Sequence, residues 1–387
     1  MAESALKICI FTSVHKPFDV RVFHREAVTL AAAGYEVVLL AAADFNQEIK
    51  NNVVVKGLAK PAGRLARFAG LWQFYARCKK ENSDVYHFHD FELLPIGWLL
   101  KKKSGKAVIY DCHENYPETA YERAWLPDWL RPLLSRLISW LEPALARSLD
   151  AVICVVPDQQ QRLQKAGCRT VLVRNLPRLE AFDKAFLEHP IPEERIVYLG
   201  GMSQVRGAFM LVDIMVEMAK SHPHLRLLCL GPFNEAHVES AVREYAVQQG
   251  VAGHIDFHPP VPFEQVAEKL LRCKIGLIPW QPSLQTTKMV YPNKVFEYMA
   301  CGLPLVASSL PSLSYIIEKS AAGLLVPPDQ PAAHATAIRQ LLEQPHLAAQ
   351  LGGNGRRFVQ QHHNWQSEAA KLLELYQQLW PSPVTPV

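Results

Sequence analysis

Short apolar runs alternate with longer amphipathic segments along most of the chain. Leu6–Phe11 is a first apolar run, a helix is predicted over Val22–Ala33 with its end at Gly34, and a second run follows at Glu36–Ala42. Strands of a parallel sheet are covered on both faces, so they appear in sequence as continuous apolar runs separated by helices. The hydrophobic pattern therefore predicts an α/β protein.

The same unit recurs in both halves of the chain. Further strands are predicted at 53–55, 84–89, 107–110, 151–155 and 171–173, and then at 195–199, 225–230, 254–257, 275–278, 303–307 and 323–326. Between the two sets, Arg174–Glu194 loses its periodicity and contains three prolines, which predicts a linker. We expect two doubly wound, Rossmann-like domains at residues 1–180 and 181–364. A final helix and a disordered tail make up residues 365–387.

Size and composition agree with a two-domain soluble protein. The 387 residues are too many for one ordinary core, and 49 % hydrophobic and 20 % charged residues are usual for a globular chain. No apolar run reaches about 18 residues, so no spanning helix is predicted, and the start of the chain lacks a secretion signal. The eight scattered cysteines fit small buried hydrophobes in a reducing compartment.

Charge is distributed unevenly. Residues 1–174 carry 24 Lys and Arg against 18 Asp and Glu, whereas residues 175–387 carry 17 against 19. A modestly basic first half fits an anionic membrane face or an anionic acceptor. The excess is too small to indicate nucleic-acid binding, and no nucleic-acid motif is present.

The stretch 288–308 predicts a loop, a helix, a tight turn and a strand. Pro292 suits the first helical position, and Gly302 suits the residue just past the helix end. Helical spacing places Lys294, Glu297 and Tyr298 on one face, near a helix start that favours anions. A ligand site is therefore predicted here. The alternative is a surface ion pair between Lys294 and Glu297.

A glycine turn follows the first strand of the second half. Gly200, Gly201 and Met202 stand between that strand and the next helix, and Arg206 adds a full positive charge. Backbone N–H groups in such a turn can approach a phosphate closely, and Arg can bridge two of its oxygens. The turn is predicted to hold a diphosphate, with a plain strand-to-helix turn as the alternative.

Polar side chains cluster at three predicted strand ends in the first half, the edge where open α/β sheets place their sites. We expect site residues among them, but an Asp19–Arg21 pair and capping of the next helix by His89 and Asp90 are alternatives. Metal-ligand spacings are absent, so no metal is expected. These candidates are His15, Asp19, Arg21, His89, Asp90, His113 and Glu114.

Two helical segments of the first half combine aromatic and basic residues. Arg64–Lys80 is predicted to be an amphipathic helix packed on the sheet, in preference to a membrane contact. Thr119–Leu149 contains three tryptophans and four arginines, which fits a membrane interface. The alternative is a core-packed helix pair, and this is the structure we expect.

These motifs resemble those of retaining glycosyltransferases of the GT-B fold, known as family 4. The resemblance spans nearly the whole chain and is most specific in Lys294–Ala307, which contains Asn-Lys-x-x-Glu-Tyr-Met-Ala followed by Cys-Gly-x-Pro, and in Asp111–Glu118. It implies two domains facing across a cleft, with the last helix crossing back to the first domain. The implied reaction moves a sugar from a nucleotide-diphosphate sugar to an acceptor hydroxyl, without a cofactor or metal.

The resemblance also implies residue roles. Glu297 would bind the ribose, and Arg206 and Lys294 would neutralise the diphosphate as the glycosidic bond breaks. His113 would contact the sugar near the reacting carbon. The donor set is completed by Gly200, Gly201, Met202, Gly231 and Val261, of which the last two would seat the base. The acceptor set is His15, Asp19, Arg21, His89, Asp90 and Glu114.

The resemblance further implies a UDP-sugar in preference to a GDP-sugar, and a sugar or lipid-linked acceptor of cell-surface polysaccharide or glycolipid synthesis. The expected location is the cytoplasm or the inner face of the membrane. The chain departs from the family pattern at Met289, where a glutamate is usual. Two alternatives stay open. A nucleotide-sugar 2-epimerase shares this fold, and the departure at Met289 motivates a catalytically decayed nucleotide-binding scaffold.

Overall fold

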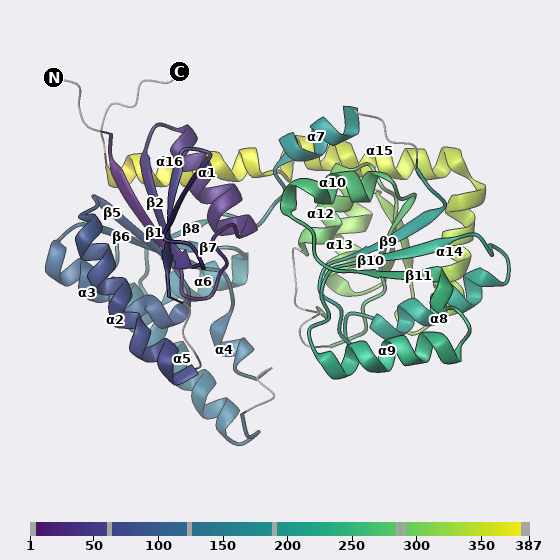
Figure 1. Ribbon diagram of the computed structural model, residues 1–387, viewed down its shortest axis with the longest axis horizontal. Helices are drawn as coiled ribbons and strands as arrows, with labels where there is room; N and C mark the ends of the chain where they lie inside the picture. The colour runs from purple at the N-terminus through teal and green to yellow at the C-terminus, as the bar shows by residue number, and fades with distance from the viewer. Residues whose placement is uncertain are drawn as a thin grey trace. The chain divides into compact units, whose positions relative to one another are not determined.

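The computed structural model describes residues 5–59, 64–121, 126–187, 192–283, 286–287 and 292–380, with the side chains of 64–69 excepted. The chain forms two compact units (Figure 1). Unit 1 is Met1–Asn175 with Ser367–Val387, and unit 2 is Leu176–Gln366. Met289 and the tail 381–387 lie outside the described residues.

Unit 1 contains an eight-stranded sheet in the order β3-β4-β2-β1-β5-β6-β7-β8, parallel except for β3. Its strands are β1 Lys7–Phe11, β2 Glu36–Ala42, β3 Gln47–Lys50, β4 Val53–Leu58, β5 Val85–His89, β6 Ala107–Cys112, β7 Ala151–Cys154 and β8 Thr170–Leu172. Its helices are the π-helix η1 Val20–Ala27, α1 Val28–Ala32, α2 Arg64–Glu81, the 3-10 turn η2 Phe91–Leu93, α3 Leu94–Ser104, α4 Tyr116–Thr119, α5 Leu130–Ala146 and α6 Pro157–Lys165.

Unit 2 contains a six-stranded parallel sheet in the order β11-β10-β9-β12-β13-β14. Its strands are β9 Arg195–Leu199, β10 Arg226–Leu230, β11 Ile255–His258, β12 Ile275–Ile278, β13 Leu305–Ser308 and β14 Gly323–Val326. Its helices are α7 Leu179–Leu187, α8 Ala208–Ala219, α9 Ala236–Gln248, the 3-10 turn η3 Ala252–His254, α10 Phe263–Leu271, α12 Asn293–Ala300, α13 Pro311–Ser320, α14 Pro331–Glu343 and α15 Pro345–His362.

Strand order in each sheet reverses next to its first strand. β1 lies between β2 and β5, and β9 lies between β10 and β12. The connections on the two sides of β1, and those on the two sides of β9, therefore run in opposite directions. Open α/β sheets leave room for a ligand at such positions, at the carboxyl ends of the strands. The polar strand ends of unit 1 and the glycine turn of unit 2 lie at these positions.

The two faces of the unit 1 sheet differ in character. Tyr86 and Phe88 of β5 belong to an apolar core shared with α2, α3, α5 and α6. The alternate residues, His87 and His89, point to the opposite face and contact η1, and His87 also contacts the last helix. One face is therefore an ordinary core, and the other contains a buried polar cluster.

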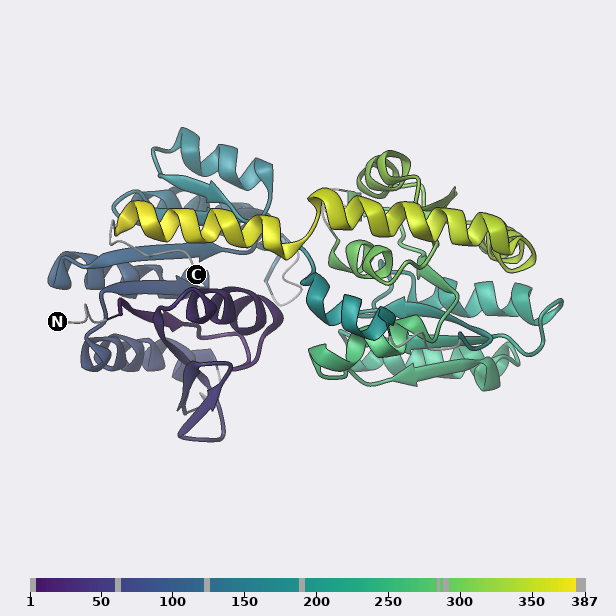
Figure 2. The same ribbon diagram turned by 90° about the horizontal axis from the view of Figure 1, so that it is seen from above.

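The last helix, α16 Trp365–Leu379, begins in unit 2 and packs on unit 1 (Figure 2). Glu368 receives two hydrogen bonds from the Arg174 guanidinium, and the Tyr376 hydroxyl lies 2.9 Å from His87 Nδ1. Both side chains on the helix are buried. The predicted return of this helix to the first domain is confirmed.

Two predictions about local structure are wrong. The segment predicted to be a linker, Arg174–Glu194, contains α7, which packs on the unit 2 core through buried Leu179 and Phe182. The tryptophans of Thr119–Leu149 were expected to be in the core, but Trp129 and Trp140 are 71 % and 68 % exposed. Trp125 lies outside the described residues.

All eight cysteines are free and buried, as predicted from their positions in apolar segments. Five lie in unit 1 and three in unit 2. Burial raises the pKa of most of these thiols. For Cys273 it raises the pKa to about 12.

The helix of the predicted ligand motif is fixed at its carboxyl end. Gly302 has φ of +68°, its N–H donates to Met299, and the Leu303 N–H donates to Tyr298. This is the glycine cap that the sequence predicts. Gly352 of α15 lies directly against the Gly302 carbonyl, where an added Cβ would be 2.0 Å from the oxygen. The two helices can approach this closely because position 352 has no side chain.

We expect Gly352→Ala to lower the free energy of unfolding by about 1–3 kcal/mol, because α15 must move away from α12. The matched control is Gly353→Ala one residue later. Its Cβ meets only the end of Arg357 at 3.5 Å, so helix propensity should make it neutral or stabilising by up to about 1 kcal/mol. Denaturant unfolding of both variants is the measurement. Equal stability of the two would refute the close contact.

Candidate functional site

Two cations converge on the glycine turn of unit 2. A Cβ placed on Gly201 would lie 3.1 Å from Arg206 Nη1, and one placed on Gly200 would lie 3.6 Å from Lys294 Nζ. Gly200 has φ of +99°, which a residue with a side chain rarely adopts. The turn therefore exposes backbone to both positive groups.

Lys294 is buried, although lysine is ordinarily charged and exposed. Its Nζ lies 3.8 Å from the centre of the Tyr198 ring and 5.4 Å from that of Trp280. Within the described part of the chain, this ammonium has no hydrogen-bond partner. Burial and the nearby Arg206 charge lower the pKa of Lys294 well below its usual value, although Glu297 partly opposes them. A ligand anion would supply the missing partner.

The face of α12 differs from the prediction in two respects. The surface ion pair offered as an alternative is wrong, because Lys294 is only 8 % exposed. Tyr298 does not share the ligand face. Its hydroxyl accepts a hydrogen bond from Leu199 N–H at 2.6 Å, and its ring fills the space beside Gly276. Tyr298 thus anchors α12 to the sheet, and half-buried Glu297 remains on the Lys294 side.

The start of α12 also differs from the prediction. Pro292 is the N-cap residue and not the first helical residue.

Glycine is also needed where β9 and β10 end. Gly231 has φ of +149°, and a Cβ there would lie 2.5 Å from the Gly200 carbonyl oxygen. Met202 N–H donates to Pro232, and Asn234 N–H donates to Met202. The turn after β10 is therefore attached to the glycine turn. Val261, after β11, is half-buried against the core.

In unit 1, Asp90 organises the loop after β1. Its Oδ2 accepts hydrogen bonds from Thr12 Oγ1 at 2.7 Å and Ser13 N–H at 2.8 Å. Asp90 itself has φ of +78°, an uncommon value for a residue with a side chain. Its side chain makes no hydrogen bond to the helix that follows, so the predicted capping role is wrong. Asp90 instead connects two neighbouring strand ends.

His15 lies between two carboxylates. Its Nδ1 is 3.5 Å from Asp19 and its Nε2 is 3.3 Å from Asp90. Burial opposes the charged imidazolium, but the hydrogen bonds and charges of Asp19 and Asp90 outweigh it and raise the pKa of His15 to about 10. Asp19 also caps η1, accepting from the backbone N–H of Arg21 and Val22.

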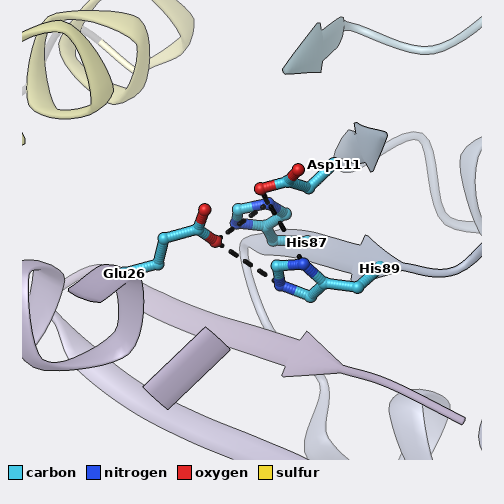
Figure 3. A group of neighbouring side chains, drawn as sticks. All are labelled: Glu26, His87, His89 and Asp111. Atoms are coloured by element: carbon cyan, nitrogen blue, oxygen red, sulfur yellow. Dashed lines mark ion pairs between the residues drawn. The ribbon is translucent and has the colours of Figure 1, made fainter. Parts of the chain in front are cut away.

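Behind this loop lies a fully buried cluster of Glu26, His87, His89 and Asp111 (Figure 3). Glu26 Oε2 is 3.7 Å from His87 Nε2 and 3.5 Å from His89 Nε2, and Asp111 Oδ2 is 3.9 Å from His87 Nε2. His89 is stacked between His87 and His113, with ring centres 4.9 and 4.8 Å away. Alternate positions of β5 and the end of β6 thus bring these groups together.

Arg21 supplies the positive charge for this cluster. Its Nη2 lies 2.8 Å from Asp111 Oδ2 and 3.0 Å from Glu26 Oε1, and its Nη1 donates to the Val173 carbonyl. The alternative of a local Asp19–Arg21 pair is realised only through the backbone, where Arg21 N–H donates to Asp19 Oδ1. The Arg21 side chain, only 4 % exposed, pairs instead with Asp111 and Glu26. Arg21 and Glu26 are five residues apart, the hydrogen-bond spacing of the π-helix in which both lie.

Protonation balances the charges of the cluster. Burial disfavours the Asp111 carboxylate, but Arg21, His113, Glu26 and His89 together outweigh it and hold the pKa of Asp111 well below its usual value. Burial and the Asp111 charge raise the pKa of Glu26. Burial lowers the pKa of His87 and of His113 to about 4. At neutral pH, a charged Arg21–Asp111 pair thus lies beside the neutral rings of His87 and His113, while Glu26 is shifted toward its protonated form.

The four residues of this cluster could also offer ligand atoms to a metal, because one atom of each lies within 4.8 Å of the others. His15, Asp90 and His113 form a second such set. In the first set the Arg21 guanidinium already bridges both carboxylates, so a divalent cation would be added beside a buried positive charge. The donor atoms fit a metal, but the charge balance does not.

His113 connects the cluster to the loop after β1. Its Nε2 is 3.0 Å from His89 Nδ1, and its Nδ1 is 3.5 Å from Asp111 Oδ1. Its ring centre lies 4.8 Å from that of His15. Glu114 differs from the other predicted residues because its side chain is exposed, while its carbonyl accepts from Gln159. The structure therefore gathers all of the predicted acceptor residues except Glu114 around His15, His113 and Asp111.

Two family models match the chain. The model described as Glycosyltransferase Family 4 covers residues 20–176, and the model described as Glycosyl transferases group 1 covers residues 193–344. This chain belongs to glycosyltransferase family 4. It is a glycosyltransferase that transfers a sugar from a nucleotide sugar.

Relatives of known activity and solved structures agree with this assignment. The D-inositol 3-phosphate glycosyltransferase of Thermobispora bispora is 22 % identical over 81 % of this chain and 75 % of its own. Sucrose-phosphate synthase from Thermosynechococcus elongatus has a TM-score of 0.73 at 23 % identity, covering 98 % of this chain and 100 % of its own. HepE from Anabaena, in complex with UDP-glucose, has a TM-score of 0.69 at 15 % identity, covering 96 % and 100 %. These likenesses confirm the predicted GT-B fold.

No described helix of this glycosyltransferase is long and apolar enough to cross a membrane.

Several members of the buried cluster are not among the residues predicted from the sequence. His87 is two residues before His89 on the same strand, and Asp111 is two residues before His113. Because residues two apart in a strand face the same side, His87 and Asp111 could have been predicted as members of the cluster. Glu26 could not be found in this way, because its contact with Arg21 depends on π-helical spacing. Tyr376 comes from the far end of the chain.

We expect Arg21→Ala to destabilise this glycosyltransferase by about 3–5 kcal/mol, because it leaves buried carboxyl groups without their counter-charge. Arg243→Ala is the control. Arg243 forms an exposed pair with Glu239 at a separation of four residues, worth less than about 1 kcal/mol. Thermal and denaturant unfolding measure both. A loss of the same size in the two variants would contradict the charge balance described for the cluster.

Stability should depend on pH through His15. The folded-state pKa of about 10 lies above the unfolded value near 6.5, so the contribution of His15 is complete below about pH 6.5 and is lost as the pH rises toward 10. We therefore expect the difference in unfolding free energy between wild type and His15→Asn to shrink over this range. Exposed His224→Asn is the control. A difference that does not change with pH would exclude the two-carboxylate account of His15.

Proposed function

We propose that this enzyme transfers a sugar with retention, without a metal, from a UDP-sugar to a hydroxyl of a sugar or lipid-linked acceptor. In this proposal, unit 2 binds the donor and unit 1 binds the acceptor. The process would be cell-surface polysaccharide or glycolipid synthesis in the cytoplasm, at the inner face of the membrane. UDP is favoured over GDP because HepE, a structural relative, binds UDP and UDP-glucose.

The observation that carries the donor assignment is the buried Lys294 ammonium beside the Gly200–Gly201 turn. A charged lysine without an acceptor is unfavourable in the interior, and a second cation, Arg206, increases the penalty. A diphosphate would bring oxygen acceptors to both cations and to the backbone of the turn. Fixed cations next to the leaving diphosphate would stabilise the negative charge that develops as the glycosidic bond breaks.

The remaining donor residues take supporting roles in the proposal. Glu297, near Lys294, would accept hydrogen bonds from the ribose hydroxyls. Gly231 and Val261, in the turns after β10 and β11, would border the base. Met202 belongs to the backbone of the glycine turn and would help to define the path of the phosphates.

On the acceptor side, His113 would contact the sugar near the reacting carbon. Its pKa of about 4 keeps it neutral at pH 7, so it would act through a hydrogen bond and not through a charge. His15, Asp19 and Asp90 would form the charged border of the acceptor site, with exposed Glu114 beside it. Arg21 and His89 are buried, so we propose that they position His113 through Asp111 and contact no acceptor themselves.

We expect Lys294→Met to weaken UDP binding by about tenfold or more, because the loss of one hydrogen bond to a charged group lowers affinity by about that factor. The same change removes a buried charge, so the ligand-free protein should be at least as stable as wild type. Thermal unfolding with and without UDP gives both quantities, and repetition in EDTA tests independence from metal. Lys319→Met, which replaces an exposed lysine of unit 2, is the control.

Two results would contradict the donor assignment. One is an unchanged UDP-induced shift in Lys294→Met, and the other is a fall in ligand-free stability in that variant. A shift in wild type that disappears in EDTA would overturn the metal-independent site. No shift with UDP, GDP, ADP or dTDP would favour the decayed scaffold. An epimerised sugar formed without any acceptor would favour the 2-epimerase.

A further inference from the structure

One side of α5 exposes large apolar residues. The exposed fractions of Trp129, Leu133, Leu137 and Trp140 are 71 %, 53 %, 53 % and 68 %. Spacings of four, four and three residues place them on a single stripe of the helix and of the residue before it. The opposite side packs on the sheet through buried Glu142 and Ala146. We call these four side chains the α5 stripe.

The α5 stripe continues onto neighbouring helices. α3 packs against both α5 and α2, and the three helices lie on one side of the unit 1 sheet (Figure 1). Trp72 of α2 is 63 % exposed and Trp98 of α3 is 37 % exposed. Four of the exposed large hydrophobic residues of this layer are therefore tryptophans, the side chain that is enriched at membrane–water interfaces.

The charges of this layer are almost all positive. α2, α3 and α5 together carry ten Lys and Arg and two acidic residues. Both acidic residues are buried and paired, Glu81 with Lys56 and Glu142 with Arg162. At the start of α5, exposed Asp128 pairs with Arg131. Lys101 of α3 likewise pairs with Asp150. A surface of tryptophan, leucine and an excess of basic residues is complementary to anionic headgroups above an apolar interior.

We propose that the α5 stripe, with α2 and α3 beside it, docks unit 1 on the surface of an anionic lipid bilayer. Trp129 and Trp140 lie at the headgroup level, Leu133 and Leu137 enter the acyl boundary, and the lysines and arginines contact lipid phosphates. A bilayer fits better than a protein partner or a second copy of this chain, because either of those would need acidic groups opposite this excess of basic residues. Docking in the plane of the interface requires no spanning helix.

The position of the docking surface deepens the proposed function. α4 packs against α5 and begins three residues after His113. The proposed membrane contact and the proposed acceptor site therefore lie in neighbouring parts of unit 1. This link rests on the proposed acceptor class of a lipid-linked hydroxyl, whereas the docking itself does not.

The test is co-sedimentation with vesicles. We expect wild type to bind phosphatidylcholine vesicles containing about 30 % phosphatidylglycerol, and to bind pure phosphatidylcholine at least about tenfold more weakly. Raising NaCl from about 0.05 to about 0.5 M should weaken binding about tenfold, because the salt screens the basic residues. The double variant Trp129→Ser with Trp140→Ser should lose about tenfold or more at low salt. The control, Val247→Ser with Tyr315→Ser, removes equally exposed residues from unit 2 and should bind like wild type.

A second measurement needs no variant. Brominated lipids should quench part of the tryptophan fluorescence of wild type, because Trp129 and Trp140 reach the headgroup level. Absence of wild-type binding, equal binding by the double variant, or unquenched fluorescence in bound protein would each overturn the proposal. A wild-type dimer that becomes monomeric in the double variant would also overturn it, in favour of an interface between copies. The UDP-induced thermal shift, measured in the same variants, reports on the donor site separately.

Discussion

The ion pair between Arg21 and Asp111 is the interaction on which unit 1 depends most. It joins η1 to the end of β6, and the same guanidinium reaches Glu26 and the Val173 carbonyl after β8. Around the pair, the π-helix brings Arg21 and Glu26 to one side, and the alternation of β5 presents two histidines. His87 extends the network to Tyr376 on α16. Residues from the beginning, middle and end of the chain thus meet at one charge-balanced centre.

Unit 2 handles buried charge in the opposite way. The interior of unit 1 contains its own counter-charge, whereas Lys294 in unit 2 lies between aromatic rings with Arg206 as a second positive group. Aromatic faces attract a cation but do not neutralise it. Unit 1 therefore needs no ligand to balance its buried charge. In the proposed function, an anion would balance the charge at the unit 2 turn, which lowers the stability of the ligand-free protein.

Much of the fold could be predicted because parallel strands leave a direct pattern in sequence. β9, β12 and β14 have the predicted bounds, and Gly302 caps its helix as expected. The misses have physical causes. The proline content around α7 hid a helix whose stability comes from packing on the unit 2 core. The exposure of Trp129 and Trp140 could not be predicted, because an apolar stripe has the same spacing whether it faces a sheet or solvent.

The site was predictable to a similar degree. Gly200, Arg206 and Lys294 could be identified because a glycine turn and a helix start have local signatures. The contacts of Arg21 with Glu26, and of His87 with Tyr376, depend on helix geometry and on residues distant in sequence. Sequence patterns therefore indicated the strand ends at which the candidate site lies, and only the structure showed that Arg21 pairs with the buried carboxyl groups behind it.

Because every cysteine is buried, the rate at which each thiol is alkylated reports how often the folded protein opens around it. Lack of solvent access, and raised pKa values wherever burial shifts a thiol, make the folded state slow to react with alkylating reagents. Modification must then proceed through local or global opening, at a rate set by the stability of the region around each sulfur. Because five thiols belong to unit 1 and three to unit 2, the order in which they are modified distinguishes the opening of one unit from that of the other.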